Sequence, residues 1–209
     1  MVMSMTIAAF DVDKTLTVRD CVIPFMRSVA GTRRLAMVAL SDVRKSVQLL
    51  RRHDRDGLKQ KFVMGIFAGR EATEIEALGI QFASVVADGW LRKDVFERMR
   101  WHQEQGHVVV LVSASLGAYL HPLGDLLEVD AVLCTELEVI DGRLTGNLHG
   151  SNCRGAEKIH RLQQWCEESG FTSDDLVYAY GDSSGDIQML EAFSRPTWVS
   201  KVDIEIGVA

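Results

Sequence analysis

Short apolar runs alternate with amphipathic stretches along most of this chain. The runs that predict buried strands are residues 5–10, 107–112, 131–134, 176–180 and 197–199. The stretches that predict helices between these strands are residues 91–105, 156–169 and 187–193. Strands that alternate with helices predict an α/β fold with a doubly wound, mostly parallel sheet that carries helices on both faces.

The pattern becomes helical between residues 22 and 87. Apolar positions recur there every three to four residues, with arginines and lysines between them, at Leu35, Ala39, Val43, Val47 and Leu50. Two further helical pieces, residues 58–67 and 71–86, follow this first stretch and are separated by a short break. This part of the chain therefore predicts an all-helical insert of roughly 65 residues.

The two patterns together predict two domains. The core consists of residues 1–17 and 88–209, and a helical cap domain of residues 18–87 is inserted after the first strand. Residues 136–140 and 143–148 flank Asp141-Gly142, which is a strong signal for a two-residue hairpin within the core.

Composition narrows the class of protein. The chain has 209 residues, of which 47% are apolar, so it can bury a sizeable core. Its net charge of −6 argues against a general nucleic-acid binder. The four cysteines form no C-x-x-C pair, which favours reduced thiols in a cytoplasmic protein over a zinc ribbon or a redox motif. We expect no signal peptide and no membrane span, because the start lacks a basic segment and no window approaches eighteen uncharged apolar residues.

Charge is distributed unevenly along the chain. Residues 27–61 hold ten basic and three acidic side chains, so this segment carries +7 and the remainder carries −13. A cationic cap segment could steer an anionic substrate or contact an anionic surface. The alternative is a solvated helix face with scattered cations.

Polar residues follow three of the predicted strands. Asp11 and Asp13 come after the first strand, Ser113 after residues 107–112, and Asp182 after residues 176–180. In open α/β sheets, ligands bind beyond the carboxyl ends of the strands. If the extended backbone continues past residue 10, Asp11 and Asp13 face the same way, and Mg²⁺ would offset the cost of burying two like charges. Taken alone, the two aspartates have a less favoured alternative, in which they are polar turn residues that end the strand.

The motifs resemble, in order and spacing, those of the haloacid dehalogenase (HAD) superfamily, and within it the phosphoserine-phosphatase-like group (subfamily IB). The first motif, D-x-D-x-T, stands at residues 11–15. The second is a hydroxyl after a hydrophobic strand, matched by Ser113, and the third is Lys158. The fourth is an acidic pair, matched by Asp182 and Asp186. The resemblance covers nearly the whole chain.

This resemblance implies covalent catalysis through an aspartyl-phosphate. Asp11 is the implied nucleophile, and Asp13, which Thr15 helps to position, is the implied acid and base. The implied phosphate-binding residues are Thr15, Ser113, Ala114 and Lys158. The implied Mg²⁺ ligands are Asp11, Asp13 through its backbone carbonyl, Asp182, and Asp186, which binds through water or orients Lys158.

The insert departs from the pattern of true phosphoserine phosphatases. Their cap carries a Met-x-Gly…Phe…Arg arrangement that binds the substrate carboxylate, and residues 20–70 lack it. Asp20 matches the acidic residue that meets the substrate amine in those enzymes. Arg51, Arg52 and Arg55 are the candidates to replace the carboxylate clamp.

The predicted function is a cytoplasmic, Mg²⁺-dependent phosphomonoesterase. The implied partner is a small phosphorylated metabolite, such as phosphoserine, histidinol phosphate or a phosphorylated amino alcohol. A lipid phosphate is the competing substrate class, because a basic and amphipathic cap could also contact a lipid surface. Peripheral contact with lipid is therefore left open. A phospho-accepting signalling domain is the alternative of another class, although the early D-x-D-x-T and the helical insert favour the enzyme. The oligomeric state is left open.

The histidines give no further signal. The spacings of His53, His102, His107, His121, His149 and His160 match no metal-ligand pattern among themselves. We predict that all six lie at the surface or at the edges of the fold.

Overall fold

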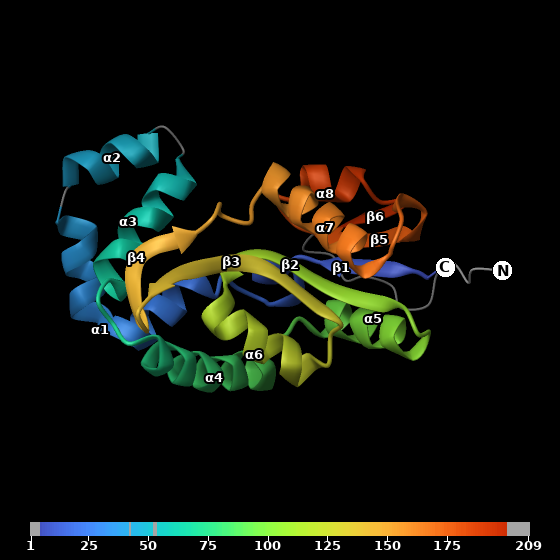
Figure 1. The fold of residues 1–209 in the computed structure, drawn as a ribbon, viewed down its shortest axis with the longest axis horizontal. Coiled ribbons are helices and arrows are strands. Elements are labelled where there is room, and N and C mark those ends of the chain that lie inside the picture. The colour runs from blue at the N-terminus through green and yellow to red at the C-terminus, as the bar shows by residue number, and fades with distance from the viewer. Residues whose placement is uncertain (1–4, 42, 52–53, 200–209) are drawn as a thin grey trace.

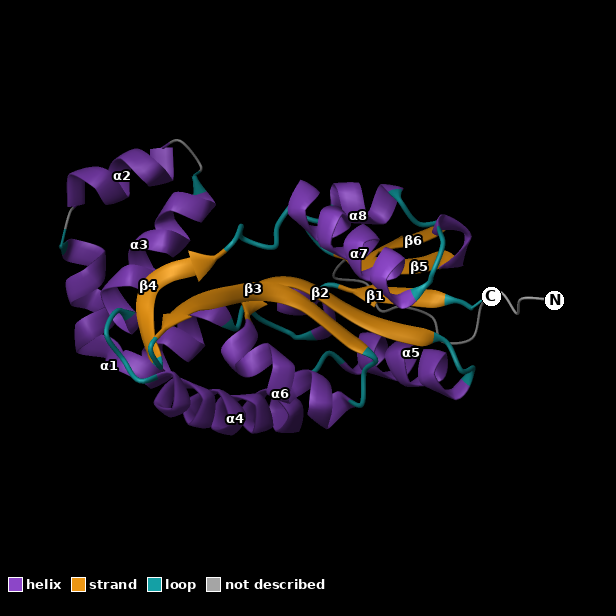
Figure 2. Cartoon of the chain, viewed as in Figure 1, coloured by secondary structure: helices purple, strands orange, loops and turns teal. Residues whose placement is uncertain are grey.

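A six-stranded sheet forms the centre of the computed structural model, which describes residues 5–41, 43–51 and 54–199 (Figures 1 and 2). The strands are β1 (Ile7–Phe10), β2 (Val108–Leu116), β3 (Ala131–Ile140), β4 (Arg143–His149), β5 (Leu176–Gly181) and β6 (Arg195–Trp198). Their order in the sheet is β4-β3-β2-β1-β5-β6. Among these six strands of the described chain, β3 and β4 are the one antiparallel pair, as the hairpin signal predicts. The predicted α/β fold with a mostly parallel sheet is confirmed.

Helices cover both faces of this sheet. They are α1 (Val22–Leu40), α2 (Val43–Arg51), α3 (Arg55–Phe67), α4 (Ala72–Gly89), α5 (Lys93–Glu104), α6 (Gly117–Leu127), α7 (Ala156–Ser169) and α8 (Ile187–Glu191). Helices α7 and α8 lie on one face beside β5 and β6, whereas α5 and α6 lie on the other face (Figure 1). Among the described residues, no helix combines the length and the apolar character that a membrane crossing requires.

Successive side chains of β1 point to opposite faces of the sheet and pack into two separate hydrophobic cores. Ile7 and Ala9 pack with the residues of α7 and α8, whereas Ala8 and Phe10 pack with those of α5 and α6. All four are fully buried, because helices cover both faces of this central strand. β1 is therefore a rigid base for the residues that follow it.

The helical insert leaves and re-enters the core at one place. Thr17 and Leu91 form an isolated antiparallel bridge. The Val18 amide donates to the Trp90 carbonyl at 2.8 Å, and the Arg92 amide donates to the Leu16 carbonyl at 2.8 Å. Helix α3 packs on β4, whereas α4 packs on α6, so the insert also contacts core elements along its length (Figure 1). The domain bounds at residues 17 and 88 stay a prediction.

Helix α6 has no counterpart in the sequence prediction. Its segment contains Gly117, Pro122 and Gly124, which all disfavour a helix interior. Packing against α4 outweighs that local preference. The two helices come so close that a Cβ on Gly79 of α4 would lie 1.8 Å from the Ala118 carbonyl oxygen. Local propensity is thus overruled by a tertiary contact.

His102 is buried, so the prediction of a surface position is wrong for this residue. It lies on the α5 face that packs against β1, and its side chain has no exposed area. Its Nδ1 is 2.8 Å from His107 Nδ1, and its Nε2 is 2.9 Å from the Tyr180 hydroxyl oxygen. Burial, together with His107 and the Arg98 cation, lowers the pKa of His102 to about 3. His53 lies outside the described residues.

We expect His102 to make the fold sensitive to acid. Its pKa is depressed in the folded chain, so the unfolded chain binds the extra proton first as the pH falls below 6.5. Stability is therefore complete above pH 6.5 and is lost toward pH 3. The expected loss is about 1–2 kcal/mol of unfolding free energy between pH 6.5 and pH 5. Urea unfolding of wild type and His102→Asn at both pH values checks this, and equal pH dependence of the two proteins would contradict it.

Candidate active site

The carboxyl ends of β1, β2 and β5 bring the predicted site residues to one edge of the sheet. β1 lies between the other two strands, and Phe10 pairs with both Leu111 and Tyr180. Asp11 follows β1 and Asp182 follows β5, while Ser113 lies inside β2, which extends to Leu116. The neighbouring strand ends therefore place these three residues side by side.

A tight turn after β1 brings two carboxylates to this edge. The backbone is extended at Asp11 (φ −69°, ψ 159°) and non-helical at Asp13 (φ −67°, ψ 116°), and then reverses at Lys14 (φ 65°). The Thr17 amide and hydroxyl both donate to the Val12 carbonyl, at 2.9 and 3.0 Å. These bonds hold a reversal in which Lys14 takes the left-handed conformation that glycine usually occupies.

The carboxylate of Asp11 is buried and held by donors on both of its oxygens. Lys158 Nζ donates to Oδ1 at 2.6 Å, and the Thr15 hydroxyl donates to Oδ2 at 3.1 Å. Burial raises the pKa of Asp11 to about 6, against the opposing effect of Lys158. Thr15 therefore bonds to Asp11 and not to Asp13, because the turn places residue 15 over residue 11.

Asp13 ends a chain of buried hydrogen bonds. The Tyr119 hydroxyl donates to Ser115 Oγ at 2.7 Å, and the Ser115 hydroxyl donates to Asp13 Oδ2 at 2.7 Å. The Cys21 amide donates to the other oxygen of Asp13 at 2.8 Å. Burial, with further repulsion from Asp20 and Asp11, raises the pKa of Asp13 to about 7. Neither Ser115 nor Tyr119 was identified from the sequence, since a hydroxyl there has no distinctive spacing.

Lys158 joins the first and last motifs at the centre of the site. Its ammonium donates to Asp11 Oδ1 and to Asp186 Oδ1, each at 2.6 Å, and only 2% of the residue is exposed. Burial lowers the pKa of Lys158, but the two carboxylates outweigh that effect and the net shift is upward. Asp186 is held in turn by the Ser183 amide and hydroxyl, at 3.0 and 2.9 Å.

Three carboxylates are close enough to hold one cation. Oxygens of Asp11, Asp182 and Asp186 lie within 4.8 Å of one another. Burial and repulsion from Asp186 raise the pKa of Asp182, against Lys14 and Lys158. A donor set made only of oxygens suits a hard divalent cation such as Mg²⁺. The carboxylate of Asp13 accepts one bond from Ser115 and one from Cys21, and the metal role that the resemblance implies for this residue uses its backbone carbonyl.

These groups line a cavity of about 140 Å³. Its lining consists of Asp11, Asp13, Lys14, Asp20, Arg55, Ser113, Ala114, Arg154, Lys158, Asp182, Ser183, Gly185 and Asp186. Nearly all of these residues are polar or charged, and both signs of charge are present. The cavity can therefore hold a small, charged molecule.

The predicted cap residues reach this cavity only in part. Asp20 and Arg55 line it, and the Asp20 carboxylate also accepts the Val22 amide at the start of α1, at 3.0 Å. Arg51, at the end of α2, is not part of the cavity lining that the structure describes. Arg52 lies outside the described residues. Thr15 is not among the lining residues and bonds to Asp11, and its role in phosphate binding stays a prediction.

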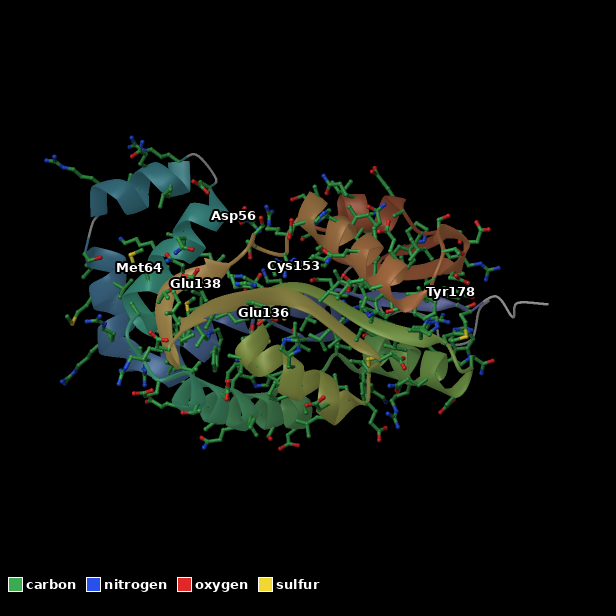
Figure 3. The ribbon with its side chains drawn as sticks, viewed as in Figure 1. Asp56, Met64, Glu136, Glu138, Cys153 and Tyr178 are labelled. Atoms are coloured by element: carbon green, nitrogen blue, oxygen red, sulfur yellow. The ribbon has the colours of Figure 1, made fainter. Side chains whose placement is uncertain are left out.

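Two cations at the site were not identified from the sequence. Arg154 lines the cavity from the segment that precedes α7. Lys59 reaches across from α3, and its ammonium donates to the Ala114 carbonyl and, at 2.6 Å, to Asn152 Oδ1. Asp56, labelled at the start of α3 in Figure 3, accepts a second bond from Asn152 at 2.6 Å. Lys59 and Asp56, which both belong to the cationic cap segment of residues 27–61, thus link the insert to the core.

Comparison with known proteins gives a family match and two informative relatives. Residues 8–191 match the family model described as haloacid dehalogenase-like hydrolase. Protein CicA from Caulobacter vibrioides is 34% identical over 187 residues, covering 88% of this chain and 81% of that protein. Histidinol-phosphatase from Neisseria meningitidis is 34% identical over 102 residues, covering 47% of this chain and 46% of that protein.

Solved structures share the fold. A protein of unknown function from Bordetella pertussis superposes with a TM-score of 0.72 at 26% identity, covering 92% of this chain and 89% of that chain. A substrate-bound phosphoserine phosphatase superposes with a TM-score of 0.61 at 19% identity, covering 92% of this chain and 84% of that chain. At that lower identity, the second likeness bears on the fold alone.

Proposed function

This chain belongs to the haloacid dehalogenase-like hydrolase family and is a phosphatase of that family, and we propose that it hydrolyses a small phosphate ester through an aspartyl-phosphate on Asp11. The observation that carries this proposal is the arrangement inside the cavity. Asp11 is fixed between Lys158 and Thr15, and Asp13 is fixed beside it by Ser115. A nucleophile and a proton-transferring group thus face one small, charged space.

In the first step, an Asp11 carboxylate oxygen attacks phosphorus. The bond between phosphorus and the ester oxygen breaks, and Asp13 gives its proton to the departing alcohol. Lys158 and the Ser113 hydroxyl contact the phosphoryl oxygens and offset their negative charge. Ala114 adds its backbone amide beside Ser113.

In the second step, water attacks the aspartyl-phosphate on Asp11. Asp13 now takes the proton of the water, and inorganic phosphate leaves with the Asp11 carboxylate regenerated. Asp186 keeps the ammonium of Lys158 in place throughout, through the bond of 2.6 Å.

Asp11, Asp182 and Asp186, together with the backbone carbonyl of Asp13, would hold Mg²⁺. A cation bound there would neutralise charge on the phosphoryl oxygens. The fit rests on the closeness of three carboxylates from two segments of the chain, the turn after β1 and the loop between β5 and α8.

The cavity supports a zwitterionic metabolite as substrate. Beyond the phosphate position it offers the cations Arg55 and Arg154 and the anion Asp20. Such a lining suits a phosphate ester that also bears an amine, such as phosphoserine, histidinol phosphate or a phosphorylated amino alcohol. We place this reaction in the cytoplasm, since all four cysteines are buried and unpaired, as the reduced state requires.

A panel of phosphate esters tests the proposal. Phosphoserine, histidinol phosphate, phosphoethanolamine and a lysophospholipid phosphate are assayed with Mg²⁺ and with a chelator. We expect repeated, Mg²⁺-dependent turnover of at least one amine-bearing ester. Preference for the lipid would replace the substrate assignment, and acceptance of a single phosphate without turnover would favour the signalling alternative.

Ser115→Ala should slow the reaction selectively. The change removes the donor to Asp13 Oδ2, so the group that delivers the proton is less well oriented. We expect kcat for an alkyl phosphate to fall about tenfold, with a smaller effect on nitrophenyl phosphate, whose leaving group needs no proton. Comparing both substrates checks this, and an equal loss on both would count against a role through Asp13.

Lys59→Met should weaken the contact between the insert and the core beside the site. The variant loses the ammonium that joins α3 to the Ala114 carbonyl and to Asn152. We expect kcat/KM to fall about tenfold, mainly through KM, because the arrangement in which α3 contacts the core at Ala114 and Asn152 becomes less populated. Lys61→Met is the matched control, since Lys61 contacts the Ala39 carbonyl within the insert. Equal effects of both changes would contradict this interpretation.

A further inference from the structure

A second group of metal-ligating side chains lies away from the active site, between α6 and β3. Cys134 and Glu136 are two residues apart on β3, so their side chains share one face of the sheet. Helix α6 packs on that face and contributes His121. Figure 3 labels Glu136 on β3, beside α6. A helix and a strand thus bring a nitrogen, a sulfur and an oxygen ligand together.

The three ligand atoms form a tight triangle. His121 Nε2 lies 2.7 Å from Glu136 Oε1, and Cys134 Sγ lies 3.7 Å from His121 Nε2. The Cys134 thiol donates to Glu136 Oε1 at 3.1 Å. All three atoms lie within 4.8 Å of one another.

This triangle is close to the one that a zinc ion imposes. With zinc–ligand bonds of about 2.0–2.3 Å in a tetrahedron, the ligand atoms lie roughly 3.3–3.6 Å apart. The separation of sulfur and nitrogen, 3.7 Å, lies about 0.1 Å above that range. The two contacts of Glu136 need to lengthen by about half an ångström, which a change in its side-chain torsions provides.

We propose that His121, Cys134 and Glu136 bind a transition-metal ion of the zinc type. The ion takes the place of the thiol proton, so a bond from sulfur to the metal forms and the proton passes to solvent. The side chains of His121 and Glu136 are 51% and 38% exposed, which leaves a fourth position for water. The proposal does not rest on the phosphatase activity.

The surroundings of the triangle both favour and oppose binding. The Glu136 carboxylate lies so close to the first residue of α6 that a Cβ on Gly117 would be 2.2 Å from its Oε2. Glycine there makes room for the carboxylate. Arg161 approaches from the other side and donates to the Cys134 carbonyl, so its cation opposes a second positive charge. A thiolate and a carboxylate together carry two negative charges, which exceed that single cation.

Ligand chemistry distinguishes this site from the cavity. Asp11, Asp182 and Asp186 offer only oxygen, which suits Mg²⁺, whereas sulfur and imidazole favour zinc or cobalt. A metal here would also tie the start of α6 to β3. That start follows the segment that carries Ser113 and Ser115, so the bound ion would brace the wall of the cavity.

Cobalt(II) titration of the full chain in excess Mg²⁺ tests the proposal. A thiolate ligand gives cobalt an intense near-ultraviolet charge-transfer band, which oxygen ligands do not. We expect one equivalent of Co²⁺ to produce the band, Zn²⁺ to displace it, and Cys134→Ser to abolish it. Cys166→Ser, which removes another buried thiol, should leave it unchanged.

The variant His121→Ala provides a second test of the site, because Cys134→Ser changes a buried residue and could disturb the fold. His121 is half exposed, so its loss leaves the core intact, and we expect cobalt affinity to fall about tenfold or more. Absence of the band in wild type, its persistence in Cys134→Ser, or unchanged affinity in His121→Ala would each overturn the proposal.

Discussion

An Asp11→Asn variant turns over phosphate esters at least about 10⁴-fold more slowly than the wild-type chain, because an amide cannot form the aspartyl-phosphate. The fold should persist. The amide has the shape of the carboxylate. Its single oxygen can still accept from Lys158, and the Thr15 hydroxyl can rotate to accept from the amide nitrogen. Removing a buried charge whose pKa burial has already raised to about 6 also limits the cost of the change.

Steady-state kinetics and thermal melting of the same preparations check this expectation. Asp88→Asn is the matched control, because Asp88 is an exposed aspartate on α4, away from the cavity. We expect its activity to equal that of wild type. An Asp11→Asn protein that melts normally and keeps even one-hundredth of the wild-type kcat would be incompatible with a nucleophilic Asp11.

The second large effect belongs to Lys158. A Lys158→Met variant leaves the carboxylates of Asp11 and Asp186 buried without their shared cation. Removing one partner of a buried ion pair costs about 3–5 kcal/mol, because the remaining charges lose their compensation. We therefore expect a loss of that size in unfolding free energy, together with loss of turnover.

Urea unfolding at pH 7 with divalent cations removed measures this loss. The double variant Lys158→Met/Asp186→Asn should recover part of the stability, since one uncompensated charge is removed with the cation. Lys93→Met, at an exposed lysine of α5 whose side chain is 88% exposed, is the control and should change stability little. A Lys158→Met protein as stable as this control would show that the buried network contributes nothing to the fold.

The strands and the centre of the cavity were predictable because their signals are local. Apolar runs mark β1, β2 and β5, and the polar residues at their ends must meet once those strands are parallel neighbours. The structure brings Asp11, Asp13, Ser113, Lys158, Asp182 and Asp186 to one cavity. Their catalytic and metal-binding roles remain the proposal made above.

The features that were not predicted depend on contacts between distant segments. Helix α6 forms against α4 in spite of its glycines and Pro122. Lys59 meets Ala114 across 55 residues, and nothing in the local pattern separates it from the other cations of the insert. The triangle of His121, Cys134 and Glu136 combines one helix with one strand, so no spacing among the histidines could reveal it.

Chemical trapping of the covalent intermediate tests the central claim most directly. The active protein is mixed with its preferred ester, quenched within the first turnover and reduced with borohydride, which converts an acyl phosphate to an alcohol. Mass spectrometry of the tryptic peptide that ends at Lys14 then locates the change. We predict homoserine at position 11 and unmodified aspartate at position 13. Reduction at position 13, or no reduction in a protein that is turning over, would contradict nucleophilic catalysis by Asp11.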